Sequence, residues 1–224
     1  MPVQEPTLAI FDHDGVLVDS LDLHQQAWLE LGRCENLHLT TEFIHETFGM
    51  TNPSIFRQLL GDDIAEAEMA RLGGIKEVCY RAAASGVIGL MAGVRELLDG
   101  LTAEGVRLAI GSSGVLPNLE LTVAECGLTG RFAAIASLED IRRGKPDPEV
   151  FLVAAKKSGV SPSRSVVFED APVGIQAAKA AGMWAVGVGT THPLESLLAA
   201  GADEVVATLV DYRVTNLVRR LRTS

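Results

Sequence analysis

Two aspartates separated by one residue follow a short apolar run near the start of the chain. The run Leu8–Phe11 is typical of a buried strand, and Asp12, Asp14 and Gly15 come directly after it. Residues two apart in extended backbone point the same way, so both carboxyl groups reach the space beyond the strand end. Two close carboxylates favour a bound cation or a retained proton, and either indicates chemistry. The alternative is an ordinary Asp-Gly turn after an edge strand.

Two later loops carry groups that can hold a phosphate. Ser112 and Ser113 follow the apolar run 106–110, where a hydroxyl and backbone amides near a helix start suit phosphate oxygens. The alternative is a turn or a helix cap. Lys145 lies in a loop before a predicted helix, and by itself it equally fits a solvated lysine.

A second pair of acids, Glu169 and Asp170, follows the apolar run 166–168. Ligands bind at the carboxyl edge of an open parallel sheet, so we expect this pair to lie near Asp12 and Asp14. Carboxylate oxygens are ligands that Mg²⁺ prefers, and the sequence therefore predicts a magnesium site. The alternative is that Asp170 only caps the next helix.

These groups together suit phosphoryl transfer. A metal ion and a lysine neutralise phosphate oxygens, one carboxylate attacks phosphorus, and a second carboxyl group moves the proton. Phosphoryl transfer depends mostly on positioning and charge neutralisation, which this set supplies.

The elements that must position these groups alternate along the chain. Repeated strand–helix units predict an α/β fold with a Rossmann-like parallel sheet covered on both faces. Residues 20–87 contain only helical patterns and predict an all-helical cap domain inserted after the first strand. Residues 1–19 and 88–224 would form the core domain. Strands are expected at 8–11, 106–110, 132–136, 165–168, 184–188 and 204–207, and core helices at 94–101, 116–126, 148–158 and 172–182, with a last helix at the C-terminus.

Composition excludes several classes of protein. The 224 residues carry a formal net charge of -10, which argues against non-specific binding to nucleic acid or to an anionic membrane. The 3 cysteines are far apart and indicate reduced thiols in a cytoplasmic protein. No apolar run is long enough to span a bilayer, and the first residues show no signal peptide.

The chain resembles the haloacid dehalogenase-like (HAD) superfamily, and within it the β-phosphoglucomutase-like branch. Four segments carry the resemblance in the family's order. They are Phe-Asp-His-Asp-Gly-Val-Leu-Val-Asp-Ser at 11–20, Gly-Ser at 111–112, Gly-Lys-Pro at 144–146 and Phe-Glu-Asp-Ala-Pro-Val-Gly-Ile at 168–175. His13 stands at a position that varies in the family.

The resemblance implies a role for each of these residues. Asp12 would be the nucleophile that becomes an aspartyl phosphate, and Asp14 would be the general acid and base. Ser112 and Lys145 would hold the transferring phosphoryl group. Dehalogenase relatives lack the second aspartate, so Asp14 argues against carbon–halogen cleavage. The implied Mg²⁺ ligands are Asp12, the backbone carbonyl of Asp14, Glu169 and Asp170.

The helical insert resembles the small cap of this branch. His24 and Lys76 match a histidine and a lysine of the sugar-phosphate mutases, and would assist closure over a substrate. The alternatives are a hinge or core histidine and a surface lysine. Asn52 stands where β-phosphoglucomutases carry an arginine for the second phosphate, and where phosphonate hydrolases carry a lysine. Arg57 could replace that arginine only if the local geometry allows.

Three functional hypotheses follow. The first is a Mg²⁺-dependent phosphohydrolase acting on a small phosphorylated metabolite, most plausibly a sugar phosphate, through an aspartyl phosphate. The second is a β-phosphoglucomutase-type hexose-phosphate mutase that uses the same covalent step. The third is a catalytically silent binding protein, which predicts erosion of the motifs, and none is eroded. The expected partner is the small substrate alone, bound by a monomer, with Ser113, His24, Asn52, Arg57 and Lys76 near it.

Overall fold

The computed structural model describes residues 6–47, 50–210, 212–215 and 217–218. Within these residues, six strands form one parallel sheet in the order β3-β2-β1-β4-β5-β6. The α/β fold with a parallel sheet is therefore confirmed. The strands are β1 (Leu8–Phe11), β2 (Arg107–Gly111), β3 (Ala134–Ala136), β4 (Ser165–Glu169), β5 (Trp184–Val188) and β6 (Glu204–Val206).

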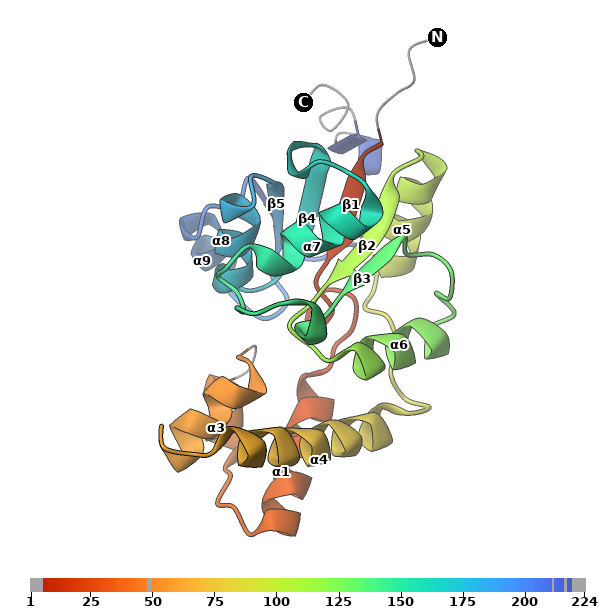
Figure 1. The fold of residues 1–224 in the computed structure, drawn as a ribbon. Coiled ribbons are helices and arrows are strands. Elements are labelled where there is room, and N and C mark those ends of the chain that lie inside the picture. The colour runs from red at the N-terminus through yellow and green to blue at the C-terminus, as the bar shows by residue number, and fades with distance from the viewer. Residues whose placement is uncertain (1–5, 48–49, 211, 216, 219–224) are drawn as a thin grey trace.

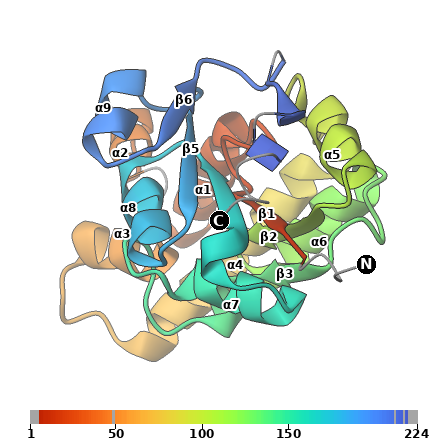
Figure 2. The same ribbon diagram turned by 90° about the horizontal axis from the view of Figure 1, so that it is seen from above.

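Helices cover both faces of the sheet because the central strands are apolar on both sides. Ala9 and Phe11 of β1 belong to the cluster that α5 (Val94–Ala103) and α6 (Leu116–Glu125) complete. Leu8 and Ile10 face the opposite cluster, which α7 (Glu149–Ser158), α8 (Pro172–Ala180) and α9 (Leu194–Ala199) complete. Figure 2 shows α7 and α8 on one side of the sheet and α5 on the other.

Four helices between β1 and β2 form the cap, which lies at the carboxyl edge of the sheet (Figure 1). They pack around their own small apolar cluster, in which Trp28 and Phe56 meet edge to face. The fifth helix of this interval, α5, instead packs on β2. The cap helices are α1 (Leu21–Glu35), α2 (Thr41–Glu46), α3 (Asn52–Leu60) and α4 (Glu66–Ala84).

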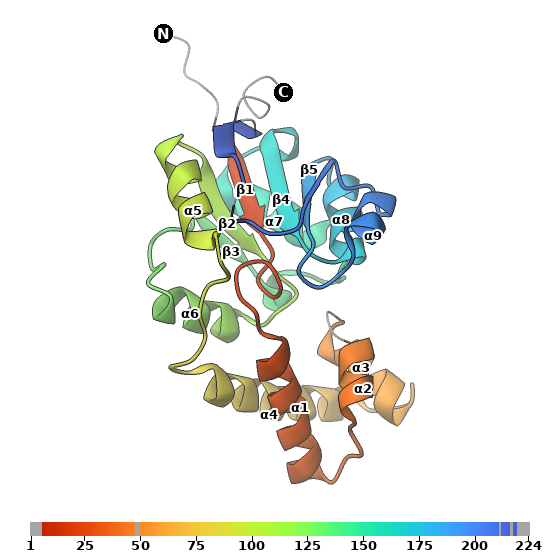
Figure 3. The ribbon, with the colours of Figure 1, turned by 180° about the vertical axis from the view of Figure 1, so that it is seen from behind.

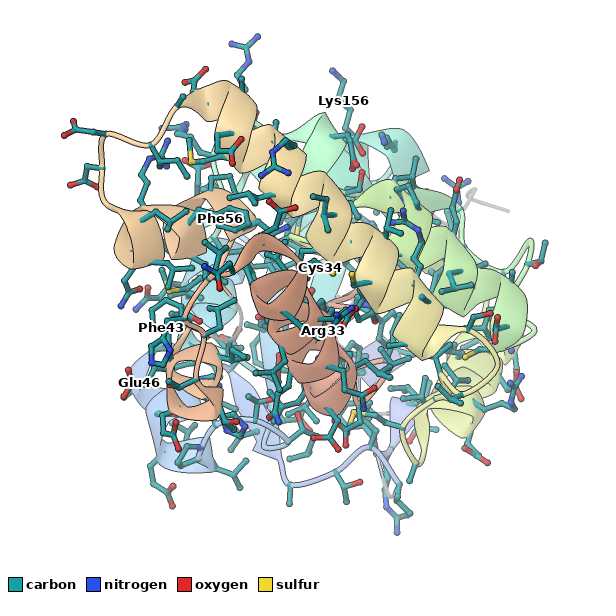
Figure 4. The ribbon with its side chains drawn as sticks, turned by 90° about the horizontal axis from the view of Figure 1, so that it is seen from below. Arg33, Cys34, Phe43, Glu46, Phe56 and Lys156 are labelled. Atoms are coloured by element: carbon teal, nitrogen blue, oxygen red, sulfur yellow. The ribbon has the colours of Figure 1, made fainter. Side chains whose placement is uncertain are left out.

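Two segments join the cap to the core, one after β1 and one before α5 (Figure 3). From the side of the cap, α1 and α4 lie in front of the sheet domain (Figure 4), and these two helices pack against each other. The inserted helical cap is thus confirmed, while its boundaries at residues 20 and 87 stay a prediction.

The structure shifts some predicted boundaries and adds one helix. Strand β3 begins at Ala134 instead of residue 132. Helix α7 begins at Glu149, and its cap residue is Pro148, one residue after the predicted cap Asp147. Asp147 still accepts a hydrogen bond from the Glu149 N–H through its Oδ1. Helix α9 follows Pro193 and was not expected. The predicted C-terminal helix lies partly outside the described residues. None of the described helices has the length and apolar character that a bilayer crossing requires.

Candidate active site

The carboxyl ends of three neighbouring strands lie side by side at the edge of the sheet that faces the cap. Phe11 of β1 lies opposite Ile110 of β2 and Phe168 of β4, so the residues after them share one edge. The Asp12 N–H donates to the Phe168 carbonyl at 3.0 Å, which fixes the start of the loop. A pocket opens here, called the acidic pocket below. Its lining includes Asp12, Asp14, Ser112, Ser113, Lys145, Glu169, Asp170, Thr191 and His192.

Lys145 is buried between two carboxylates of the acidic pocket. Its Nζ lies 2.9 Å from Asp12 Oδ2 and 3.1 Å from Glu169 Oε2. Burial lowers the pKa of Lys145, but the charges of Asp12 and Glu169 outweigh burial and raise it. The lysine is therefore a fixed ammonium at the strand edge, and a solvated loop lysine is ruled out.

Asp12, Glu169 and Asp170 form a buried acidic cluster. One carboxylate oxygen from each lies within 4.8 Å of the other two. Burial and the charge of Asp12 raise the pKa of Asp170 to about 7, and the same causes raise that of Glu169 well above its usual range. Among the described residues that line the pocket, Lys145 is the only lysine or arginine. The raised pKa values show that one ammonium does not compensate three ionised carboxylates, so full ionisation of the cluster calls for a further cation.

The cluster fits a hard divalent cation. Asp12 Oδ1 is buried and accepts no hydrogen bond from the described residues, so this oxygen is free to bind a metal ion. A divalent ion would supply the further cation and satisfy that oxygen, and oxygen-only donors are typical of Mg²⁺ sites. The alternative that Asp170 only caps α8 is wrong, because Ala171 is the cap residue and makes no side-chain bond.

The loop after β5 supports this cluster, and sequence reasoning missed it. Thr190 Oγ1 donates to the Gly15 carbonyl, and His192 Nδ1 lies 3.1 Å from the Asp170 carbonyl. Thr191 hydrogen-bonds the Asp170 side chain and so opposes the rise of the Asp170 pKa. The sequence could have indicated this loop, because its polar residues follow the predicted strand 184–188 at the same edge of the sheet.

Asp14 is held by three side chains through one of its oxygens. Its Oδ1 accepts from Ser20 Oγ, from His13 Nδ1 at 3.0 Å and from His24 Nε2 at 3.3 Å. Burial raises the pKa of Asp14, but the two imidazoles outweigh burial and hold it well below its usual range. His13 in turn places Nε2 2.7 Å from Thr122 Oγ1. Asp14 is therefore a fixed carboxylate in this structure.

Ser112 and Ser113 lie between the acidic pocket and the cap. Ser112 Oγ accepts from the Gly114 N–H at 3.0 Å, so this hydroxyl organises the turn after β2. Ser112 also lines the acidic pocket, and the turn and phosphate interpretations are compatible. Ser113 lines this pocket and the second one, described next.

A second pocket, called the cap pocket below, opens between the cap and the core and shares Asp14 with the first. Lys76 is buried there, with Nζ 2.8 Å from His24 Nδ1 and 2.9 Å from Glu77 Oε1. Lys76 is therefore no surface charge. Arg57 is exposed and is absent from the described lining, so the structure gives no support to its expected role. The polar lining includes His13, Asp14, His24, Thr51, Asn52, Lys76, Glu77, Ser113 and Asn118.

Comparisons with known proteins agree with this architecture. The family model described as haloacid dehalogenase-like hydrolase matches residues 9–188. A validoxylamine A 7'-phosphate phosphatase from Streptomyces hygroscopicus subsp. limoneus is 33% identical over 217 residues, covering 92% of this chain and 95% of the relative.

Two solved structures share the fold over nearly the whole chain. A β-phosphoglucomutase from Clostridium difficile has a TM-score of 0.85 at 25% identity, covering 97% of this chain and 98% of its own. CbbY from Rhodobacter sphaeroides, in complex with xylulose-(1,5)bisphosphate, has a TM-score of 0.81 at 26% identity, covering 92% and 96%. This chain belongs to the haloacid dehalogenase-like hydrolases, in their β-phosphoglucomutase/CbbY-like branch, and is a phosphatase-type enzyme of that family.

Proposed function

We propose that the protein is a Mg²⁺-dependent phosphatase that hydrolyses a phosphate monoester of a small metabolite, most simply a sugar phosphate. The observation that carries the proposal is the contact of Lys145 with Asp12 beside the acidic cluster. It joins a nucleophile, a fixed cation and a set of metal ligands at one strand edge. Curated relatives at about 30% identity include a hexitol phosphatase and a fructose-1-phosphate phosphatase from Escherichia coli, which favours a phosphorylated polyol or sugar.

In the first step, an Asp12 carboxylate oxygen attacks phosphorus and the bond from phosphorus to the leaving oxygen breaks. Lys145 holds the nucleophile in place and neutralises phosphoryl oxygens, and Ser112 orients them. Asp14 gives a proton to the leaving oxygen. The pKa of Asp14 is low in the free enzyme. The negative charge of an arriving phosphate would raise this pKa, because a nearby negative charge disfavours the ionised form of Asp14 and favours its protonation.

In the second step, water attacks the aspartyl phosphate while Asp14 accepts its proton. The acyl phosphate bond breaks, inorganic phosphate leaves, and Asp12 is restored as a carboxylate. Asp12, the Asp14 carbonyl, Glu169 and Asp170 would hold Mg²⁺, which when bound neutralises charge on the phosphoryl group. The His24 imidazole donates a hydrogen bond to Asp14 and so holds the Asp14 carboxyl group beside the cap pocket.

A second candidate is a hexose-phosphate mutase, favoured by the structural similarity to β-phosphoglucomutase. One experiment separates the two. The protein is incubated with Mg²⁺, β-glucose 1-phosphate and a trace of glucose 1,6-bisphosphate, and glucose 6-phosphate and free phosphate are followed together. Free phosphate without isomerisation supports the phosphatase. Rapid glucose 6-phosphate formation with little free phosphate supports the mutase.

The nucleophile has its own test. Asp12→Asn removes the attacking oxygen while keeping the shape of the side chain, so hydrolysis of p-nitrophenyl phosphate should fall to background. Activity that survives this substitution would contradict the aspartyl phosphate. A cytoplasmic location and a monomeric state stay predictions.

A further inference from the structure

The cap pocket contains a buried carboxylate that the proposed chemistry does not use. Glu77 of α4 lines this pocket, and its side chain is only 11% exposed. Oε1 accepts from Asn52 Nδ2 at 2.7 Å and from Lys76 Nζ at 2.9 Å. Oε2 accepts from Asn118 Nδ2 at 2.5 Å. Donors from the cap and the core thus fix this carboxylate between the two domains.

Glu77 is ionised in the structure. Burial raises its pKa, but the Lys76 ammonium and the amide donors of Asn52 and Asn118 outweigh burial and lower it. A charged group with this many hydrogen bonds does not leave its place readily, because each lost bond would expose a buried charge.

Glu77 also neutralises the cation of the cap pocket. Among the described residues of the lining, Lys76 is the only lysine or arginine. Two of its three N–H donors are directed to Glu77 and to the acceptor nitrogen of His24. Glu77 therefore cancels the charge of Lys76, and the described lining holds no lysine or arginine that is not already paired. A second phosphate on the substrate would meet the Glu77 carboxylate there instead of an unpaired cation.

We propose that Glu77 is a specificity-determining residue that restricts the enzyme to monophosphates whose leaving group is uncharged or cationic, and rejects bisphosphates. This inference rests on the proposed phosphatase function and names the class of its substrate. The fold alone does not impose the restriction, since the related CbbY was solved with a bisphosphate. The charge of Glu77 imposes it, because like charges in a partly buried pocket repel with little screening.

Matched pairs of ligands test the restriction by binding, so turnover of either ligand is not required. Hydrolysis of p-nitrophenyl phosphate with Mg²⁺ is the reporter, and the inhibition constants of glucose 1-phosphate and fructose 1-phosphate are compared with those of the corresponding 1,6-bisphosphates. In the wild type we expect each bisphosphate to bind at least about tenfold more weakly than its monophosphate, which corresponds to about 1.4 kcal/mol. In Glu77→Gln, which keeps the shape and removes the charge, this gap should close.

Glu66→Gln is the matched control, because Glu66 is exposed on the first turn of the same helix. It should keep the wild-type gap. Equal constants within every pair, tighter binding of the bisphosphates, or an unchanged gap in Glu77→Gln would overturn the inference. Absence of p-nitrophenyl phosphate hydrolysis by the wild type would instead overturn the proposed phosphatase function. The wild-type comparison needs no variant, so it holds even if Glu77→Gln folds poorly.

Discussion

Gly15 leaves room for the Asp170 side chain, and Gly15→Ala should therefore damage the proposed metal site. A Cβ at position 15 would lie 2.0 Å from Asp170 Oδ2 and 2.7 Å from Thr191 Oγ1, whereas real Cβ contacts essentially never fall under 3.0 Å. The Asp170 carboxyl group must then move by about 1 Å (3.0 minus 2.0). A misplacement of that size at a reacting centre costs on the order of 10²-fold in rate.

The variant also carries a backbone cost that must be separated from the clash. Gly15 has φ +75, where a residue with a Cβ costs about 1–2 kcal/mol. Gly105 has φ +76, and no atom lies within 4 Å of the position its Cβ would take. Gly105→Ala therefore reproduces the backbone strain without the clash, at a turn before β2.

The assay is p-nitrophenyl phosphate hydrolysis titrated with Mg²⁺, with thermal unfolding measured in parallel. Both variants should lose the stability that the backbone strain costs, and Gly15→Ala should lose more because of its clash. Only Gly15→Ala should need a higher Mg²⁺ concentration for half-maximal rate, by roughly ten- to a hundredfold, which is the range for disturbed metal ligands. If both variants need the same Mg²⁺ concentration for half-maximal rate, then the close approach of Asp170 to Gly15 does not affect Mg²⁺ binding and our reasoning is wrong.

Three further outcomes are expected. Asp170→Ala should abolish Mg²⁺-dependent turnover while the circular dichroism spectrum stays native, and normal turnover at saturating Mg²⁺ would refute the metal site. Lys145→Met should lower kcat by on the order of 10²–10³-fold, because a fixed positive charge at the phosphoryl group is lost; a wild-type kcat would contradict its role. Glu77 has a lowered pKa in the fold, so its stabilisation is present above the ordinary value of 4.5 and is lost as the pH falls through the lower folded value. The difference in melting temperature between wild type and Glu77→Gln should thus shrink below about pH 4.5, and a constant difference down to pH 2 would count against an ionised Glu77.

The sequence by itself determined the strands, most helices and the residues that follow the strands. These depend on local patterns, since apolar runs of four or five residues and helical periodicity need no tertiary information. Asp12, Asp14, Ser112 and Asp170 were predictable for the same reason. In a parallel sheet, a residue directly after a strand is at the ligand-binding edge. Helix α9 was missed because six residues give too little periodicity to detect.

Only the tertiary structure decided which side chains meet across the two domains. Glu77 and Asn118 are 41 positions apart, and nothing in their local sequence indicates a contact of 2.5 Å. The burial of Lys76 and the exposure of Arg57 likewise depend on which faces of α4 and α3 are turned toward the core. Charge pairing inside a closed pocket is a property of packing, because it is fixed by helix positions that no short stretch of sequence encodes. The residues of the candidate active site were therefore readable from the chain, while the charge pairing inside the cap pocket required the fold.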